Sequence, residues 1–436
     1  MMQFRNNICF IIEISWIFVH SYICYHLCYI NYAQFIHVLS KKLAKKNILY
    51  VKLFQAIVLN NNFIDDITNN ELLKYTDSVP YDYKDIDLIT IKLLQDQHNI
   101  FLEDINPINA GMVSLVYKAT RKGKNASDNE KVVIKIKRKN IEDKLLCSTE
   151  QFRFLGQILS YIPICRAMNI PFTIQRMIDI MMQQTDFMQE VKNMQEMKEK
   201  CKHLSYIKIP NVYEDITKTF PNVILMEFID GKHIMQVDEE DYEIFAKQII
   251  KYGFVSSLMG GITHGDLHSG NILFIKYTDS VTQQIVCQIA PIDYGIVVRI
   301  SENMKLIMLD IAAEMTTAHP DILAEKLITG LMSPPDLKHI IPAEDYANLV
   351  KIFSGIVKDT ICTANQAKIY EFFTKLNKYL LKSDLKKFGI RVNDDFAKIQ
   401  TAIAMANGIS MTLCKNKYIE MLNVTIQELF HTDLFL

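Results

Sequence analysis

The stretch "HGDLHSGNILF", residues 264–274, holds two histidines, an aspartate and an asparagine directly before an apolar run. Packing alone does not require this composition. The run "NILFIKY" is followed by the polar segment "TDSVTQQ" and then by "IVCQIAPID", a pattern that predicts an antiparallel hairpin. In such a hairpin the first strand starts where the second strand ends, so we expect Asn271 and Asp293 to lie close together.

Asn271 and Asp293 together offer an amide oxygen and a carboxylate. These are the oxygen ligands that Mg²⁺ takes when substrate phosphates fill its remaining positions. Asp266 precedes Asn271 by five residues on the same loop, close enough to orient a nucleophilic hydroxyl or water. A helix cap for Asp266 and a turn for Asn271 are ordinary alternatives for each residue alone, but the set together favours chemistry.

A second candidate pair lies upstream. In "KVVIKIKR" the period of two places Lys135 on the same strand face as Val133. A lysine in a strand is more often an edge or snorkelling residue. In "DFMQEVKNMQEMKEK", however, Glu190 shares the apolar face of a predicted helix with Phe187 and Met194. Because a buried acid needs a cation, we predict that Lys135 pairs with Glu190.

Composition limits the class of protein. With 436 residues, 49% of them hydrophobic, the chain can bury large cores in two or three domains. The 48 basic and 49 acidic residues nearly balance, which argues against a nucleic-acid partner. The nine cysteines are scattered and show no metal-ligand spacing, so we expect reduced thiols in a reducing compartment.

The pattern along the chain predicts four segments. These are a hydrophobic helical segment that can contact a membrane (1–40), a helical extension (41–100), a β-rich lobe (101–230) and a large helical lobe (231–436).

The hydrophobic segment from Ile8 to Ile30 has the length of a membrane span but contains Glu13, His20 and His26, which are costly at a bilayer centre. A helix that lies on a membrane, or packs on the protein, is therefore favoured over a span. The following stretch "LSKKLAKKNILYVKLFQAIVLNN" predicts an amphipathic helix, for which a solvated face is favoured over membrane-surface contact.

The central loop resembles a known catalytic motif. His264, Asp266 and Asn271 match the H-R-D-x-x-x-x-N loop of the protein-kinase-like fold, with His268 where protein kinases often have lysine, and "DYG" at 293–295 resembles D-F-G. The resemblance implies an α+β, two-lobed fold with a small β-rich N-lobe and a large helical C-lobe. Because HGDLHxGN also occurs in aminoglycoside- and choline-kinase-type phosphotransferases, the loop indicates the fold more sharply than the substrate.

Almost the whole chain resembles the UbiB, or aarF-domain, atypical kinases linked to coenzyme Q biosynthesis. The matching stretches are "KLFQ" for K-x-G-Q (Lys52 and Gln55 matching, Phe54 in the glycine position), "PINAGMVS" for the nucleotide loop, "VVIKIKR" for V-A-V-K-V-x-R, "QTDFMQEVKN" for E-x-D-F-x-x-E-A-x-N (Gln184 for the first acid, Asp186 and Glu190 kept), "HGDLHSGN" for H-x-D-x-H-P-G-N, and "AIAMANGISMTL" for the terminal helix.

The resemblance implies a role for each matched residue. Lys135 would clamp the phosphates and Glu190 would position it, Asp266 would orient the acceptor, and Asn271 and Asp293 would bind Mg²⁺. The nucleotide-binding residues would be Asn109, Ala110 and Gly111 in the loop, Val116 and Val133 against the adenine, and Met226, Glu227 and Phe228 in a linker whose main chain at Glu227 and Phe228 bonds the adenine edge.

The family implies a Mg²⁺-ATP-binding phosphotransferase or ATPase acting on a small or lipid-associated acceptor, with mitochondrial or other intracellular membranes as the usual location. In the family the K-x-G-Q extension covers the peptide-receiving face and contacts the E-x-D element. Gly111 in place of alanine is expected to make the nucleotide loop more flexible.

Two alternatives stay open. A small-molecule kinase of the aminoglycoside or choline type would have no functional extension. A pseudokinase scaffold would have no chemical need for the lysine, the glutamate, both aspartates and the asparagine, all of which this sequence keeps.

Overall fold

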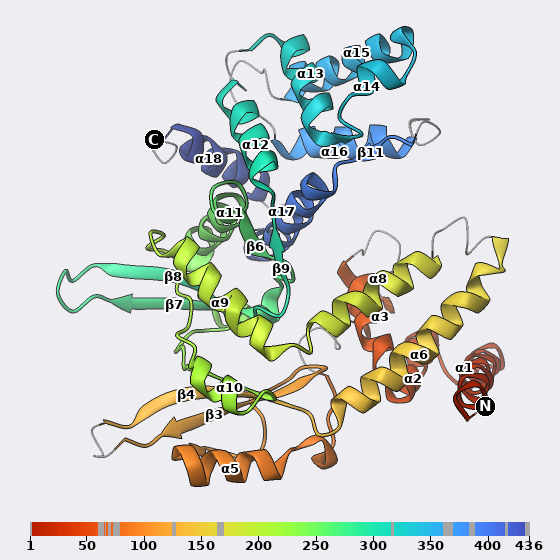
Figure 1. The fold of residues 1–436 in the computed structure, drawn as a ribbon, viewed down its shortest axis with the longest axis vertical. Coiled ribbons are helices and arrows are strands. Elements are labelled where there is room, and N and C mark those ends of the chain that lie inside the picture. Colours follow the sequence, from red (N-terminus) through yellow and green to blue (C-terminus); the bar gives the residue numbers. More distant parts are fainter. Residues whose placement is uncertain are drawn as a thin grey trace. The chain divides into compact units, whose positions relative to one another are not determined.

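The structure is a computed structural model, which describes residues 2–59, 65, 67–68, 71–72, 79–123, 128–163, 170–314, 318–360, 369–382, 389–414 and 417–431. It divides into two compact units (Figure 1). The N-unit comprises Met1–Lys192 and Pro210–Phe228, and the C-unit comprises Asn193–Ile209 and Ile229–Leu436. Helix α9 (Phe187–Cys201) contributes residues to both units.

The N-unit combines one antiparallel sheet with helices. Its strands are β1 (Ile100–Leu102), β2 (Asn109–Ala110), β3 (Ser114–Arg121), β4 (Glu130–Lys137) and β5 (Val223–Glu227). Its helices are α1 (Met2–His26), α2 (Tyr32–Lys46), α3 (Leu49–Leu59), η2 (Tyr83–Asp85), α5 (Leu88–His98), α6 (Ile141–Ser160), α8 (Ile170–Gln183) and α10 (Glu214–Thr219). The sheet order is β1-β3-β4-β5, with β2 paired to β3.

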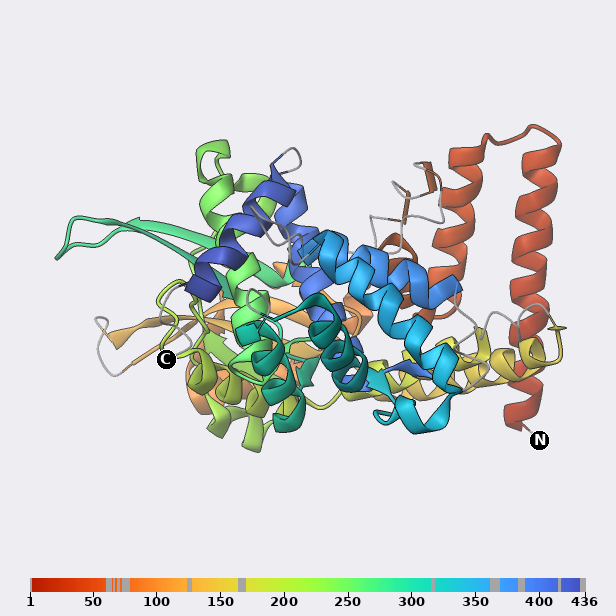
Figure 2. The same cartoon turned by 90° about the horizontal axis from the view of Figure 1, so that it is seen from above.

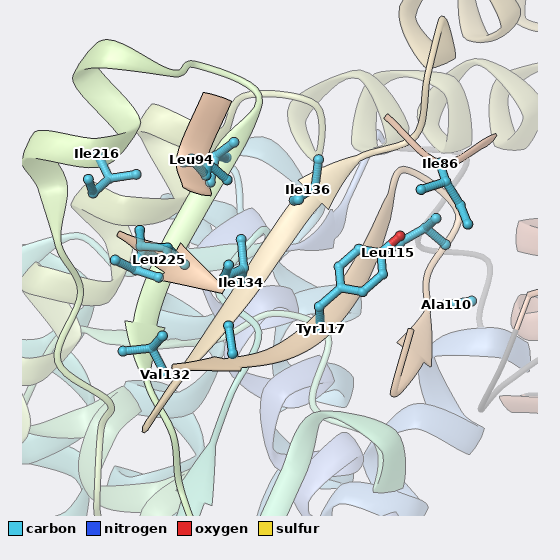
Figure 3. Close-up of a cluster of buried hydrophobic side chains, with 13 residues drawn as sticks. Ile86, Leu94, Ala110, Leu115, Tyr117, Val132, Ile134, Ile136, Ile216 and Leu225 are labelled. Atoms are coloured by element: carbon cyan, nitrogen blue, oxygen red, sulfur yellow. The ribbon is translucent and has the colours of Figure 1, made fainter. Parts of the chain in front are cut away.

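The alternation along the strands gives the sheet two different faces. One face is the core of the N-unit, which α5 covers (Figure 3). Its buried side chains are Ile86, Leu94, Ile100, Ala110, Leu115, Tyr117, Ala119, Val132, Ile134, Ile136, Ile216, Val223 and Leu225. Because side chains alternate, the other face carries Val116 opposite Lys135, and Val133 opposite Met226.

The N-terminal helices form an antiparallel hairpin, α1 against α2, which Figure 2 shows in side view. Helix α2 starts with a capping box, in which the side chain of Asn31 accepts from the main chain of Gln34 and the reverse bond is also made. The amphipathic helix expected across residues 39–61 is instead two helices, α2 and α3, over the part of this range that the structure describes, which ends at residue 59. The chain leaves the helical conformation at Asn47, whose buried side chain donates to the carbonyl of Ser148 and accepts from the N–H of Leu49.

The C-unit is mainly helical. Its helices are η4 (Ile234–Gln236), η5 (Glu239–Asp241), α11 (Tyr242–Leu258), η6 (Ser269–Asn271), α12 (Glu302–Glu314), α13 (Pro320–Leu331), α14 (Leu337–Ile340), α15 (Ala343–Thr360), α16 (Ile369–Lys382), α17 (Asp394–Leu413) and α18 (Tyr418–His431). Its strands are β6 (Ile262–His264), β7 (Ile272–Thr278), β8 (Ile285–Pro291), β9 (Val297–Arg299), β10 (Met332–Ser333) and β11 (Arg391–Val392).

Helix α11 is the centre of the C-unit. Most of its residues are buried, and it packs against α17, where a Cβ at Gly253 would lie 2.9 Å from the Cβ of Ala406. The predicted hairpin is present as β7 paired with β8, and it projects as a long ribbon in Figure 1. The ring of Phe274 on β7 contacts Phe245 on α11 with centroids 5.1 Å apart, so the buried helix supports the base of the hairpin.

Candidate functional site

The five polar residues of the C-unit loop and hairpin form one cluster, which we call the catalytic-loop cluster: His264, Asp266, His268, Asn271 and Asp293. The hairpin register pairs Ile272 with Pro291, so Asn271 and Asp293 flank the same end of the ladder. The Ile292 N–H donates to the Asn271 carbonyl at 3.0 Å. The structure therefore brings Asn271 and the segment of Asp293 together, as the hairpin topology predicts.

Within the loop, hydrogen bonds set the orientation of Asn271. Its amide Nδ2 donates to the carbonyl of Asp266 at 3.0 Å, and the amide oxygen Oδ1 is the acceptor of the same group. The carboxylate Oδ1 of Asp293 accepts from the Gly295 N–H at 3.0 Å. His268 accepts from the Gly270 N–H through Nδ1, which fixes the turn that precedes Asn271. Asp266, Asn271 and Asp293 are all partly exposed.

His264 is a buried support for this cluster. Its Nδ1 accepts from the Asp266 N–H at 3.1 Å, and its ring lies 5.6 Å from that of Tyr294. Burial lowers the pKa of His264, while the charges of Asp293 and Asp266 oppose that shift. The imidazole is therefore neutral at neutral pH and serves as a hydrogen-bond acceptor for the loop.

The "DYG" segment is fixed from its other side by α9. Asn193 donates through Nδ2 to the Tyr294 carbonyl at 2.9 Å and accepts through Oδ1 from Arg299, also at 2.9 Å. The Tyr294 hydroxyl donates to the Pro291 carbonyl at 3.0 Å. Asn193 was not singled out from the sequence, although it is the final residue of the E-x-D-F-x-x-E-A-x-N stretch.

Gly265 is a second residue that the sequence argument missed. Its N–H donates to the Ile296 carbonyl at 2.9 Å, which pulls the loop against the chain before β9. A Cβ at this position would lie 2.6 Å from Cγ2 of Ile296 and 3.1 Å from Cγ2 of Val298. Only glycine fits this approach without movement. A glycine between the histidine and the aspartate of the loop was the available signal.

In the N-unit the predicted lysine–glutamate pair is formed. Nζ of Lys135 lies 2.7 Å and 2.9 Å from the two carboxylate oxygens of Glu190. The side chains are only 10% and 3% exposed. Phe187, one helical turn before Glu190, places its ring 5.6 Å from the ammonium. Phe187, Met194 and Met197 are buried as the helical spacing predicts.

The apolar residues predicted to contact adenine share one sheet face with Lys135. Val116 on β3 lies directly opposite Lys135 on β4, and Met226 on β5 lies opposite Val133. By the period of two, all four side chains lie on the sheet face opposite the core. The predicted nucleotide loop, Asn109 to Gly111, continues into β3 on this sheet, and Asn109 pairs with Val116.

The main-chain bonds to the adenine edge at Glu227 and Phe228 stay a prediction, although both N–H groups there already have partners. The N–H of Glu227 already donates to the Asn211 carbonyl at 2.8 Å, and that of Phe228 points to the Lys131 carbonyl at 3.4 Å. These two N–H groups are therefore engaged within the protein. The reason is that the segment near Asn211 adds main-chain bonds along the outer side of β5, which the sequence did not reveal.

Gly111 was expected to make the nucleotide loop more flexible, and this stays a prediction. Its N–H donates to the Ser114 carbonyl at 2.9 Å, and its carbonyl accepts from Nε and Nη2 of Arg138 at 3.0 and 2.6 Å. A Cβ at Gly111 would meet only ordinary contacts. The loop is therefore held by hydrogen bonds on both sides, and glycine is not required there for space.

The family-motif residues of the extension lie in the N-unit helices. Lys52 and Gln55 belong to α3, which packs against α6 and α8. Phe54, in the position of the family's glycine, is buried beside the ring of Tyr50. Asp186 accepts from the Gln189 N–H at 2.9 Å and so caps α9. A contact between Lys52 and the E-x-D-like element stays a prediction.

Comparison with known proteins identifies the family. The model of the ABC1 atypical kinase-like domain matches residues 75–326, more than half of the chain. The chain belongs to this family. The predicted kinase-like fold class and the resemblance to aarF-domain kinases are thereby confirmed.

Among the relatives, the Arabidopsis thaliana protein ACTIVITY OF BC1 COMPLEX KINASE 1, chloroplastic, is 24% identical over 396 residues, which cover 88% of this chain and 54% of the relative. AarF domain-containing protein kinase 1 of Gallus gallus is 26% identical over 126 residues, 28% of this chain and 23% of that protein. The match thus spans about half the length of the Arabidopsis relative and 23% of the Gallus gallus protein.

A solved structure of a Mycobacterium tuberculosis protein, titled as the complex of Rv3197 with erythromycin, matches with a TM-score of 0.46 at 15% identity. The match covers 82% of this chain and 87% of that one.

Proposed function

We propose that this chain is a magnesium- and ATP-dependent phosphotransferase that acts on a small or lipid-associated acceptor, with water as the acceptor in an ATPase reaction. The observation that carries the proposal is the catalytic-loop cluster. The Asn271 side chain donates to the Asp266 carbonyl, and the Asn271 carbonyl accepts from the N–H of Ile292, the residue before Asp293. Membership of the atypical kinase-like family supports the same reaction class.

The donor set of the cluster fits a magnesium ion. Asn271 offers an amide oxygen and Asp293 a carboxylate, and Mg²⁺ binds one or two such protein oxygens and fills its other positions with phosphate and water. Among the described residues no group of three or more His, Cys, Asp or Glu side chains could hold a metal alone. The ion, when bound with ATP, would neutralise negative charge on the transferred phosphate.

Each remaining residue has a defined task in this proposal. Asp266, held in place through its own N–H by His264, orients the hydroxyl of the acceptor or a water and receives its proton. Lys135 binds nucleotide phosphates, and Glu190 fixes the position of its ammonium group. Val116 and Val133 supply apolar contact to the adenine.

We also propose that the acceptor is a lipid-associated molecule, as in quinone lipid metabolism, and that the protein works at an intracellular membrane. The support is the family resemblance of the K-x-G-Q-like extension together with α1. Among the described helices, one stretch, Arg5–His26, is long and apolar enough to cross a membrane.

The surroundings of α1 favour a surface helix over a span. Phe10 and Ile14 are buried against the N-unit, and the ring of Phe10 lies 6.4 Å from that of Phe152 on α6. Another part of the helix surface is exposed, with Trp16 at 66%. The carboxylate of Glu13 forms an ion pair with Lys46 on α2, which reduces the cost of placing it near lipid.

The test compares three aspartate variants by thermal shift and by release of phosphate from ATP. A ligand at about 100 times its Kd stabilises the native state by about 2.7 kcal/mol, which raises the melting temperature of a chain of this size by about 3 °C. Asp293→Ala should lose the extra shift that Mg²⁺ adds to ATP, and it should lose turnover. Asp266→Ala should keep the Mg²⁺-dependent shift and lose turnover.

Asp345→Ala is the matched control, because Asp345 is an exposed carboxylate on α15 of the same unit. It should behave as wild type in both assays. Equal Mg²⁺-ATP shifts in wild type and Asp293→Ala would refute the metal assignment. A wild type that shows no shift with any metal and nucleotide would refute the phosphotransferase proposal in favour of a scaffold.

The acceptor is tested separately, with labelled ATP and panels of small metabolites and of lipids in vesicles. Transfer of label to a lipid or small molecule in wild type, but not in Asp266→Ala, identifies the acceptor class. Release of inorganic phosphate without transfer to any acceptor would identify an ATPase.

A further inference from the structure

Arg138 is buried directly after β4 and makes several polar contacts, although the proposed function gives it no role. Its side chain is 3% exposed and donates to Asp85 at 3.1 Å. It also donates to the carbonyls of Val79 at 3.2 Å and of Pro80 at 3.0 Å. Two further bonds, from Nε and Nη2, reach the carbonyl of Gly111 in the nucleotide loop. One side chain thus joins the loop to the segment 79–85.

The segment 79–85 is itself tightly bound to the loop and to the chain after β4. The Val79 N–H donates to the Ala110 carbonyl at 2.8 Å, and the Lys139 N–H donates to the Asp85 carbonyl at 2.8 Å. Lys144 adds a second cation at 2.6 Å from the Asp85 carboxylate. Although burial opposes its ionisation, the hydrogen bond from Lys144 and the charge of Arg138 hold the pKa of Asp85 below its usual value. The buried pair is therefore charged at neutral pH.

The contacts of Arg138 determine which way one peptide group of the loop points. A trans peptide is planar, so the carbonyl of Gly111 and the N–H of Met112 point in opposite directions. Because the carbonyl is bound by the guanidinium group, the N–H of Met112 is directed away from it. Among the residues that the structure describes, none accepts a hydrogen bond from this N–H.

We propose that Arg138 is a positioning residue that presents the Met112 N–H as a donor to a nucleotide phosphate, with Asp85 holding the guanidinium in place. This inference rests on the proposed ATP binding. Main-chain N–H groups in loops of this kind bind phosphate oxygens because each offers a fixed partial positive charge at short range. Two bonds from one planar fork determine the peptide orientation better than a single ammonium can.

The proposal separates contacts to phosphate from contacts to adenosine. Adenosine would meet the apolar sheet face at Val116 and Val133, which Arg138 does not touch. Loss of the peptide orientation should therefore weaken ATP binding and leave adenosine binding unchanged. A purely structural role for Arg138 would weaken both ligands alike, because a displaced sheet would lose both kinds of contact.

The experiment measures Kd for Mg²⁺-ATP and for adenosine in the full chain by calorimetry. Arg138→Lys keeps the charge and most of the volume but cannot make the two bonds to Gly111, and we expect ATP affinity to fall at least 10-fold with adenosine affinity unchanged. Asp85→Asn should show a smaller loss with the same selectivity. Lys144→Met is the matched control, because Lys144 contacts Asp85 but not the loop, and it should bind both ligands as wild type does.

The outcomes are distinct. Equal losses for ATP and adenosine in Arg138→Lys, or no loss for either, would overturn the positioning role while leaving the proposed function intact. A wild type that binds adenosine and ATP with equal affinity would also overturn it, because phosphate then contributes nothing. A wild type that binds neither ligand refutes the proposed function itself. If Arg138→Lys proves unstable, the affinities for ATP and adenosine are compared in Asp85→Asn instead, which is a smaller change.

Discussion

Removal of Glu190 should separate the contribution of the buried Lys135–Glu190 pair to protein stability from its contribution to nucleotide binding. The carboxylate is 3% exposed and the Lys135 ammonium lies 2.7 Å from it. At that distance the Coulomb attraction is about 6 kcal/mol for an effective dielectric constant of about 20. Desolvation of both groups offsets much of this attraction, so the intact pair contributes less to net stability.

Breaking the pair on one side is different, because the partner charge stays buried. Glu190→Ala leaves the Lys135 ammonium beside the ring of Phe187 without its carboxylate. We expect a loss of about 3–5 kcal/mol in the free energy of unfolding. Lys135→Met should cost a similar amount, since it removes the ammonium group from beside the buried carboxylate of Glu190.

The double variant Lys135→Met, Glu190→Met separates the effect on stability from the effect on nucleotide binding. It removes both charges and fills similar volume, so its stability should return to within about 1 kcal/mol of wild type. Its ATP affinity should stay low, because the phosphate-binding ammonium is gone. Thermal and urea unfolding measure the first quantity, and ATP titration measures the second. If the double variant regains ATP affinity, or if the single variants are as stable as wild type, the reasoning is wrong.

Three further predictions concern other parts of the chain. Burial gives His264 in the folded chain a pKa below its ordinary value of 6.5, so the unfolded chain binds more protons at acidic pH. Stability should therefore fall as the pH drops below about 6.5. In thermal melts between about pH 5 and 7, His264→Asn should reduce this pH-dependent loss of stability. Gly265→Ala should destabilise by about 1–3 kcal/mol, whereas Gly408→Ala on α17, where a Cβ meets nothing within 4 Å, should be neutral or stabilising. Trp16→Glu should reduce sedimentation with vesicles, and Met235→Glu, at an 88% exposed residue of η4, should not.

The parts of the fold that could be predicted were those encoded by local periodicity. The period of two along β4 placed Val133 and Lys135 on one face, and the helical spacing of α9 placed Glu190 on a buried face. A buried carboxylate and a buried strand lysine are expected to pair with each other, because neither charge is tolerated alone in an apolar environment. That mutual requirement made a contact across 55 sequence positions predictable.

The hairpin was predictable for a related reason. Two apolar runs separated by a short polar turn have essentially one way to pair, and the register then decides which polar residues meet at the open end. Asn271 and the segment of Asp293 follow from this local topology. Local periodicity says nothing about contacts beyond the hairpin, so the bonds that Asn193 makes to the Tyr294 carbonyl and to Arg299 could not be predicted from the sequence.

The contacts that the sequence did not reveal share a physical cause, which is that main-chain hydrogen bonds leave no mark on side-chain patterns. The N–H of Glu227 is taken by the Asn211 carbonyl, and the carbonyl of Gly111 by Arg138. The identity of a residue does not reveal the direction of its own peptide group. The backbone at a glycine, which the sequence suggests is flexible, can therefore be held by hydrogen bonds from neighbouring residues. For this reason the orientation of the Met112 N–H, and with it the role of Arg138, follows only from the three-dimensional arrangement. The same arrangement explains why Arg138→Lys, although it keeps the charge, should reduce ATP affinity. The guanidinium group of Arg138 donates two hydrogen bonds to the Gly111 carbonyl, and the single ammonium of lysine cannot reproduce this geometry.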